Sequence, residues 1–319
     1  MASRPWSSRA RRALLSALVT ASVALPVSGA ARPAAVPAPA PAALTPLGGA
    51  GPSALDARYA AGREGIRAAR ETAARHGDRR RAAALTAMAA PGRTFLMFDG
   101  RDGGRSVEVF GDLSSARRIA VMVPGAGVGL DHYWRLRRDA GTLLGELGGG
   151  SAVVAWLGYR TPDLLSPSAL TTGRAGEAAP VLRSFVRELA GARPAARISL
   201  LCHSYGSVVC ARAASGLDVA DIVLYGSPGT GSGSAAGLRT RATVWAGTGA
   251  EDWVGHVPHT ALRLPFLTVG FGADPVSPGF GAEVFDAGDA AHSDYLRPGS
   301  VSLRGIAAIV TGATGGRDA

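Results

Sequence analysis

Residues 197–210 place Ser204 between a run of mostly apolar residues and a run of small ones. Residues 202–206 read Cys-His-Ser-Tyr-Gly, which is the G-x-S-x-G pattern with Cys202 in place of the first glycine. In this pattern a strand turns sharply into a helix, and the strained turn presents the serine hydroxyl above the edge of a sheet. We therefore predict that Ser204 is a nucleophile on an elbow of this kind.

A serine hydroxyl needs two partners to react near neutral pH. An imidazole accepts its proton, and a carboxylate holds the imidazole in one tautomer. On such an elbow the partners follow the serine in the order acid, then histidine. Asp252 stands just beyond a predicted strand at 242–246, and His292 lies in a loop rich in Gly, Ala and Asp before the last predicted helix. We predict that Asp252 orients the imidazole and that His292 is the general base and then the general acid.

Other residues compete for both roles. A carboxylate directly beyond a strand end suits the orienting role, and the apolar Trp253-Val254 pair would shield it from water. Glu251, Asp274 and Asp286 remain alternatives for the acid, and Asp252 could instead belong to a simple loop turn. The other histidines lie too early in the chain, beside the serine, or too close behind Asp252; they are His76, His132, His203, His256 and His259.

Acyl transfer also needs hydrogen-bond donors for the oxyanion of its transition state. In elbow enzymes these are backbone N–H groups after the serine and after an earlier strand. We predict the amides of Tyr205 and Ala126; Ala126 belongs to Pro-Gly-Ala-Gly at 124–127, behind a predicted strand at 118–123. The alternative for 124–127 is a glycine-rich turn without a catalytic role. Residues that could line a pocket around the serine are Gly125, Tyr159, His203 and Trp253.

The N-terminus has the residue order of an export signal. Arginines precede an apolar segment at 13–25, and small residues follow it up to about residue 31. This segment is shorter than the ~20 residues that span a bilayer. We predict an export signal at 1–30 and a secreted or cell-envelope protein without a stable membrane span after cleavage; an uncleaved anchor is the alternative. Residues 31–52 are rich in Pro and Ala, which predicts a disordered linker.

The two cysteines, Cys202 and Cys210, lie on either side of the predicted elbow. Because the elbow folds the helix back across its strand, the two positions could come within bridging distance. An oxidising compartment would permit a disulfide. The alternative is a pair of small buried side chains that pack where Gly or Ala would also fit.

The elements that must position these residues alternate along the chain. Helical spacing of apolar residues predicts N-terminal helices at 53–92 that pack on a catalytic domain at 93–315. A predicted antiparallel hairpin, 94–98 with 106–110, opens that domain, and strands then alternate with helices. This order predicts an α/β fold with a mostly parallel sheet between two helix layers. Further strands are predicted at 153–157, 197–202 and 222–225, a final strand at 266–269 or 283–285, and helices near 175–189, 205–214 and 302–311.

The net charge of +10 does not indicate a nucleic-acid partner. Most of the excess comes from arginines at 1–92, in the predicted export signal and on the solvated faces of the predicted helices, so the catalytic part is almost neutral. The segment around Gly125 lacks the glycine spacing of a dinucleotide loop and the lysine of a phosphate loop. We expect no cofactor and no metal ion.

Several motifs together resemble the α/β-hydrolase superfamily, and within it a bacterial branch known as a domain of unknown function. The resemblance covers about residues 90–312 and implies an α/β-hydrolase fold and a serine hydrolase, without implying a substrate. The branch usually begins its elbow with Gly, so Cys202 is a departure that leaves the nucleophile in place. The motifs are Val123-Pro-Gly-Ala-Gly, Ala155-Trp-Leu-Gly-Tyr, His203-Ser-Tyr-Gly-Ser, Leu224-Tyr-Gly-Ser-Pro-Gly, Asp274-Pro-Val-Ser-Pro-Gly-Phe and His292-Ser-Asp-Tyr.

These residues predict an exported serine hydrolase that forms an acyl-enzyme on Ser204. A carboxylic ester is the favoured substrate because its leaving group departs more easily than that of an amide. The substrate would be a small-molecule or lipid ester. An acyltransferase with the same three residues, and a non-catalytic surface binding protein on a hydrolase scaffold, are the alternatives. The sequence does not indicate an oligomeric state.

Overall fold

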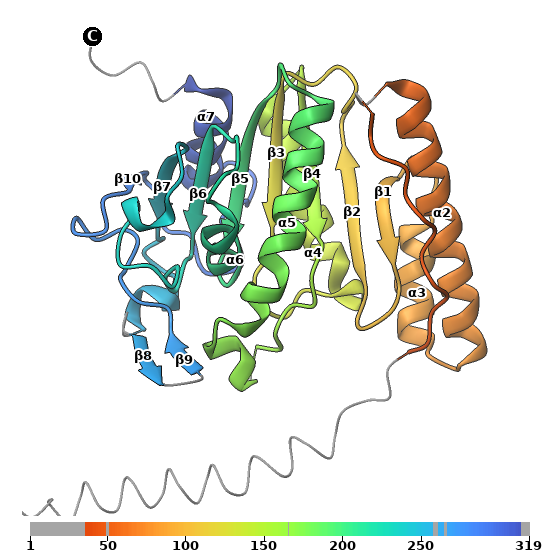
Figure 1. Ribbon diagram of the computed structural model, residues 1–319, viewed down its shortest axis with the longest axis horizontal. Coiled ribbons are helices and arrows are strands. Elements are labelled where there is room, and N and C mark those ends of the chain that lie inside the picture. Colours follow the sequence, from red (N-terminus) through yellow and green to blue (C-terminus); the bar gives the residue numbers. More distant parts are fainter. Residues whose placement is uncertain (1–35, 49–50, 165, 258–260, 265–266, 314–319) are drawn as a thin grey trace, which may run out of the picture. The chain divides into compact units, whose positions relative to one another are not determined.

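The computed structural model describes residues 36–313, apart from 49–50, 165, 258–260 and 265–266 (Figure 1). The predicted export signal and the beginning of the predicted linker lie outside the described residues. No helix in the described part of the chain is long and apolar enough to cross a membrane. The same residues contain no group of three or more His, Cys, Asp or Glu side chains that could hold a metal ion.

A central sheet of eight strands forms the middle layer, in the order β1-β2-β4-β3-β5-β6-β7-β10. β2 pairs antiparallel with β1 and with β4, and all other neighbours are parallel. This is the α/β-hydrolase fold that the sequence predicted. The strands are β1 Thr94–Asp99, β2 Arg105–Phe110, β3 Arg118–Val123, β4 Ser151–Leu157, β5 Arg197–His203, β6 Asp221–Tyr225, β7 Thr243–Gly247 and β10 Glu283–Val284.

Helices cover both faces of the sheet, and each face has its own hydrophobic core. One core joins α5 and α6 to the sheet through residues such as Leu182 and Val208. The other joins α2, α4 and α7 through residues such as Ile66, Leu143 and Ile306. Because both faces are covered, the middle strands are apolar nearly throughout. The helices are α2 Pro52–Arg75, α3 Arg79–Met88, α4 Tyr133–Leu147, α5 Gly173–Ala192, α6 Gly206–Ala213 and α7 Val301–Thr311.

Two elements, α4 and β8, were not predicted from the sequence, and the structure decides between the two candidates for the final strand. α4 was not predicted, although Tyr133, Leu136, Ala140 and Leu143 are buried at helical spacing and its arginines occupy the other face. The segment 283–284 supplies the last strand of the central sheet. The competing segment instead becomes β9 Leu267–Gly270, which pairs with the unpredicted β8 Ala261–Leu264 in a separate two-stranded sheet (Figure 1).

The expectation of a disordered linker does not hold for residues 36–48. They form no helix or strand, but they run beside α2 as part of the domain (Figure 1). Leu47 is fully buried, and its N–H donates a hydrogen bond to Glu188 on α5 over 2.9 Å. Arg58 of α2 donates to the Thr45 carbonyl and pairs with the same Glu188. These contacts fix the path of a proline-rich segment that forms no helix or strand of its own.

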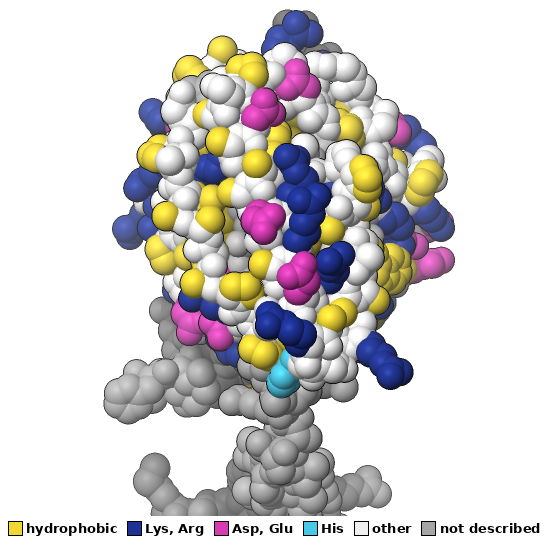
Figure 2. All heavy atoms as spheres, turned by 90° about the vertical axis from the view of Figure 1, so that its right-hand side faces the viewer, with side chains coloured by type: hydrophobic (Ala, Val, Ile, Leu, Met, Phe, Trp, Pro, Cys, Tyr) yellow, Lys and Arg dark blue, Asp and Glu magenta, His cyan; other side chains and the backbone are white. Residues whose placement is uncertain are grey.

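The N-terminal helices pack beside the edge strand β1. A Cβ atom on Gly62 of α2 would lie 2.5 Å from the Phe95 carbonyl oxygen, so only glycine permits this close approach. On the outer face of these helices, arginines are interspersed with acidic and apolar side chains (Figure 2). This mixture is typical of a solvated surface.

Candidate active site

Ser204 lies on the turn between β5 and α6, where the sequence predicted an elbow. Its φ of 51° is in the left-handed region, which is unusual for a residue with a side chain. The Ser204 N–H donates to the Tyr225 carbonyl over 3.1 Å, which ties the turn to β6. A Cβ on Gly206 would lie 2.4 Å from the Val123 carbonyl oxygen, so the glycine after the serine is required by the close approach of β3.

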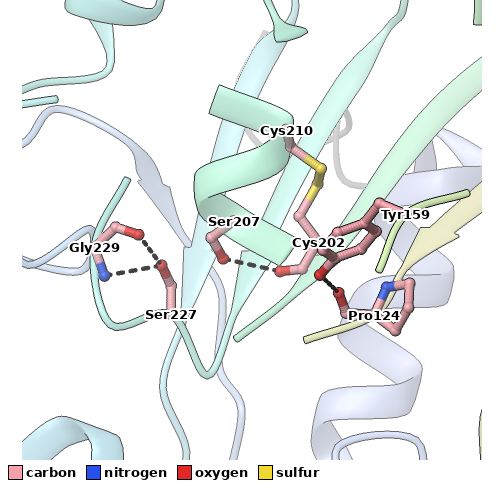
Figure 3. Close-up of a disulfide and its surroundings, with 7 residues drawn as sticks. All are labelled: Pro124, Tyr159, Cys202, Ser207, Cys210, Ser227 and Gly229. Atoms are coloured by element: carbon pink, nitrogen blue, oxygen red, sulfur yellow. Dashed lines mark hydrogen bonds between the residues drawn. A yellow bond between two sulfur atoms is a disulfide. The ribbon is translucent and has the colours of Figure 1, made fainter. Parts of the chain in front are cut away.

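The cysteine that replaces the first glycine of the pattern forms a disulfide. Cys202 at the end of β5 is bonded to Cys210 on α6, and both side chains are buried in the core beneath α5 and α6 (Figure 3). Ser207 adds a second link, because its hydroxyl donates to the Cys202 carbonyl over 3.1 Å. The strand and helix that form the elbow are therefore joined covalently on one face of the sheet.

Three side chains from distant parts of the chain meet at the carboxyl edge of the sheet. His292 Nε2 lies 3.0 Å from the Ser204 hydroxyl oxygen. His292 Nδ1 lies 3.0 and 3.1 Å from the two carboxylate oxygens of Asp252. A tautomer with hydrogen on Nδ1 donates to Asp252 and leaves Nε2 free to accept the serine proton. This geometry has the form of a proton relay for an activated serine.

The Asp252 carboxylate is buried and fully engaged. It follows β7 and caps the short 3-10 helix Trp253–His256 through the Val254 N–H. Tyr295 donates its hydroxyl to the other carboxylate oxygen over 2.6 Å. Burial opposes ionisation of Asp252, but the hydrogen bonds from His292, Tyr295 and Val254 outweigh it, so the pKa of Asp252 lies below its usual value. Asp252 is therefore ionised near neutral pH, so its carboxylate can accept the hydrogen bond from His292 Nδ1–H.

Of the four carboxylates considered, Asp252 is the one that contacts the imidazole. Glu251 is exposed beside it. Asp274 accepts a hydrogen bond from the Val276 N–H, and Asp286 accepts one from the Gly288 N–H. Both are small turns stabilised by an aspartate.

Tyr295 was not among the predicted site residues. Its hydroxyl also accepts a hydrogen bond from the Gly249 N–H over 3.0 Å, so the phenol bridges the loop after β7 and the carboxylate. Burial and the bond to Asp252 raise the pKa of Tyr295, which keeps the hydroxyl protonated as a donor. The available signal was its place at the end of the His-Ser-Asp-Tyr motif, three residues after His292.

His203 holds the backbone of the proposed base. Its Nε2 lies 2.7 Å from the His292 carbonyl oxygen, and its ring packs against both the Tyr225 and the Tyr295 ring. Burial, together with the charge of His292, lowers the pKa of His203 to about 3. The ring is therefore neutral, and Nε2–H donates to the carbonyl. His203 lies at the cavity beside Ser204 and also positions the His292 backbone.

The predicted oxyanion segment lies directly against the serine. A Cβ on Gly125 would lie 2.7 Å from the Ser204 Cβ, which shows how close β3 and its loop come to the elbow. The loop is fixed from behind, because Tyr159 donates to the Pro124 carbonyl over 2.7 Å (Figure 3) and Gly127 N–H donates to the Pro162 carbonyl. Among the described residues, neither the Ala126 nor the Tyr205 N–H has a hydrogen-bond partner.

Two aromatic residues have roles other than lining the cavity beside Ser204. Tyr159 was expected in the pocket, but its ring is buried against Trp156 and its hydroxyl supports the loop at 124–127. The Tyr205 side chain is also buried; its hydroxyl donates to the Thr171 carbonyl and accepts from the Ala175 N–H at the start of α5. Only the backbone of Tyr205 faces the proposed oxyanion position.

Comparison with known proteins identifies the family. The sequence profile of the alpha/beta hydrolase family matches residues 99–262, which is about half of the chain. The chain belongs to the alpha/beta hydrolase family. The match begins at the end of β1 and ends in β8, so it includes Ser204 and Asp252.

The chain is also similar to several individual proteins. Uncharacterised proteins of Mycobacterium tuberculosis and Mycobacterium bovis are 33% identical over 166 residues, which is 46% of this chain and 61% of those proteins. The matched region thus spans less than two thirds of the relatives. Among solved structures, a serine hydrolase without lid from Xanthomonas campestris is 18% identical, with a TM-score of 0.45 over 70% of this chain and 96% of its own. The esterase LipW from Mycobacterium marinum is 19% identical, with a TM-score of 0.42 over 78% and 89%.

A cavity of about 430 Å³ opens beside Ser204 in this alpha/beta hydrolase. His292 and Trp253 stand at the serine, and their rings lie 5.0 Å apart between centroids. The wall formed by α4 and its surroundings is largely apolar, with Met122, Leu136 and Leu296 in its deeper part. The polar exceptions on this wall are Arg135, Arg138 and Asp139 of α4. Burial raises the pKa of Asp139, although Arg138 pairs with it.

Proposed function

We propose that this hydrolase cleaves carboxylic esters through an acyl-enzyme on Ser204. The observation that carries the proposal is the continuous hydrogen-bond chain from the Ser204 hydroxyl through both nitrogens of His292 to Asp252. An apolar cavity next to the serine supports an acyl or alkyl group in the substrate. Ester cleavage is favoured over amide cleavage because an alkoxide is the better leaving group.

The proposed reaction assigns a role to each of these groups. His292 takes the proton from Ser204 as the hydroxyl oxygen attacks the ester carbonyl, and the imidazolium is stabilised by Asp252. The tetrahedral oxyanion accepts hydrogen bonds from the Ala126 and Tyr205 N–H groups. Its collapse breaks the bond to the alcohol, which leaves with the proton from His292. Water then repeats the sequence on the acyl-enzyme, releases the carboxylic acid and restores the serine.

Labelling with a fluorophosphonate tests the nucleophile. We expect intact-mass spectrometry to show one adduct on the purified protein and none on Ser204→Ala. Ser115→Ala is the matched control, because Ser115 bonds to Asp112 on an exposed turn and should not affect the adduct. Absence of an adduct on the wild-type chain would refute the acyl-enzyme and favour a non-catalytic binding protein.

Product analysis separates hydrolysis from acyl transfer. p-Nitrophenyl esters of increasing acyl length would be incubated with and without an added alcohol. We expect free carboxylic acid as the main product in both cases. A dominant new ester in the presence of the alcohol would show that the enzyme is an acyltransferase.

Export from the cytoplasm is part of the proposal. Residues 1–30 have the charge and hydropathy order of a signal, and the Cys202–Cys210 disulfide suits an oxidising compartment. N-terminal sequencing of protein recovered from the envelope and medium of an expressing bacterium tests it. We expect a mature terminus close to residue 31; an intact Met1 on protein confined to the cytoplasm would contradict it.

A further inference from the structure

Three large apolar side chains are exposed at the mouth of the cavity that holds Ser204. Trp134, Leu164 and Trp253 are 57%, 59% and 57% exposed, and all three line the cavity. They come from α4, from the loop after β4 and from the 3-10 helix after β7. We call these three residues the rim. Exposed apolar groups gathered at one place indicate a surface that binds an apolar partner.

The α4 side of the rim is basic. Arg135, Arg137 and Arg138 are exposed on the first turns of α4, next to Trp134. The guanidinium carbons of Arg135 and Arg138 lie 5.4 and 5.9 Å from the centre of the Trp134 ring. Asp139, the acidic residue on this part of α4, is paired with Arg138 and half-buried. The surface thus combines an aromatic group with excess positive charge.

The acidic residues near the rim are distributed unequally. Asp163 directly precedes Leu164 and Glu251 stands two residues before Trp253, and both are exposed. Asp131, which precedes α4, is paired with Arg81. Uncompensated positive charge therefore collects on the α4 side, which would face the anionic groups of a partner.

We propose that the rim docks on the surface of an anionic lipid layer and that the substrate ester is taken directly from that layer. Tryptophan suits the boundary between hydrocarbon and water, because its ring is apolar and its N–H is polar. Arginine stems can lie along apolar surface while the guanidinium groups pair with lipid phosphates. Docking in this way would place the apolar cavity against the lipid, so an acyl chain could enter without crossing water. The lipid substrate rests on the proposed function, whereas the docking itself does not.

Binding to vesicles tests the docking without turnover. The full chain carrying Ser204→Ala would be mixed with vesicles of phosphatidylcholine alone or with added phosphatidylglycerol, and binding would be followed by co-sedimentation and tryptophan fluorescence. We expect a blue shift and tighter binding to the anionic vesicles. Each arginine at the surface is worth about fivefold in affinity, so Arg135→Gln with Arg138→Gln should weaken the anionic binding by about tenfold or more.

The rim variants and their controls separate this surface from the rest of the chain. Trp134→Ser with Trp253→Ser should weaken binding to both kinds of vesicle by about tenfold or more, since both changes remove apolar area that docking would take out of water. Val284→Ser and Arg241→Gln change an exposed apolar residue and an exposed arginine away from the cavity, and should leave binding unchanged. All variants keep the same residues 1–35, so any vesicle binding by that segment is common to them and does not affect the comparison between variants. Circular dichroism and thermal unfolding confirm that each variant is folded.

The outcomes distinguish this inference from the proposed function. Absence of vesicle binding, or equal binding by the rim variants, overturns the docking surface even if Ser204 reacts with the fluorophosphonate. Binding that depends on the rim supports the docking even if no adduct forms. A rim that instead captures a second copy of the chain, seen as a dimer by light scattering and insensitive to vesicles, also overturns it.

Discussion

The end of β5 is held in different ways on its two faces. On one face, Cys202 is bonded to Cys210 and buried among apolar side chains. On the other face the next residue, His203, supports the His292 backbone through one hydrogen bond and packs among aromatic rings. One face therefore fixes the elbow covalently, and the other holds the proposed base by hydrogen bonds. We expect changes on the first face to affect stability. On the second face, we expect turnover to depend on the groups that orient the imidazole, and the buried His203 ring to affect stability in acid.

The largest expected effect is a loss of turnover when the hydrogen bonds that hold His292 are changed. Asp252→Asn should lower kcat by about 10⁴-fold, because an amide can hold the imidazole in the wrong tautomer. Ester hydrolysis under saturating substrate measures it. Asp286→Asn is the matched control, since Asp286 caps a turn and does not contact His292, and it should retain nearly full activity. Comparable losses in both variants would show that the loss does not come from the imidazole contact.

Removal of the disulfide on the first face should lower the stability of the fold. Replacing both cysteines with alanine should lower the free energy of unfolding by about 2–3 kcal/mol, because the bridge closes a short loop. Urea unfolding of the double variant measures the change. Below the unfolding transition, fluorophosphonate labelling of Ser204 should continue. A large loss of labelling with an unchanged free energy of unfolding would show that the disulfide serves the reactivity of Ser204 and not the stability of the fold.

Tyr295→Phe should reduce kcat by roughly tenfold or more, because it removes a hydrogen bond to a charged group that orients the imidazole. KM should change little. The same bond lowers the pKa of Asp252, so its removal raises that pKa. Asp252 stays ionised near neutral pH in both forms, so the loss of kcat should persist across the neutral range. An unchanged kcat would argue that Tyr295 only fills space.

The smallest effect at neutral pH is expected for His203. Its pKa in the folded protein is about 3, below the usual value of about 6.5, so the unfolded chain binds the extra proton between these two values. This contribution to stability is fully present above pH 6.5 and is lost as the pH falls towards 3. His203→Gln should flatten the decline in unfolding free energy between pH 7 and pH 5. An unchanged slope would show that another group causes the decline.

The parts of the site that were predictable are those that depend on residues close in the sequence or on the order of the strands. Ser204, Cys202 and Gly206 lie within five residues, so a local pattern reveals the turn. Asp252 and His292 could be proposed from chain order, because parallel strands bring their carboxyl ends to one edge. Tyr295 stands in the His-Ser-Asp-Tyr motif, but its bond to Asp252 was missed, and so was the role of Tyr159 behind the loop at 124–127. A single aromatic residue carries no periodic signal that shows what its hydroxyl contacts. The order of residues 36–48 was also missed, because Leu47 and Arg58 find their partner Glu188 across 130 or more residues.

The sequence by itself determined the fold class, the elbow serine and the order in which its partners follow. These depend on local spacing and on alternation of strands with helices, which neighbouring residues carry. Only the tertiary structure decided that Asp252 and not Asp286 contacts His292, that the cysteines are joined, and that Trp134, Leu164 and Trp253 meet at one cavity. Such contacts depend on the path of the chain between distant segments, and the close packing of the two cores selects that path.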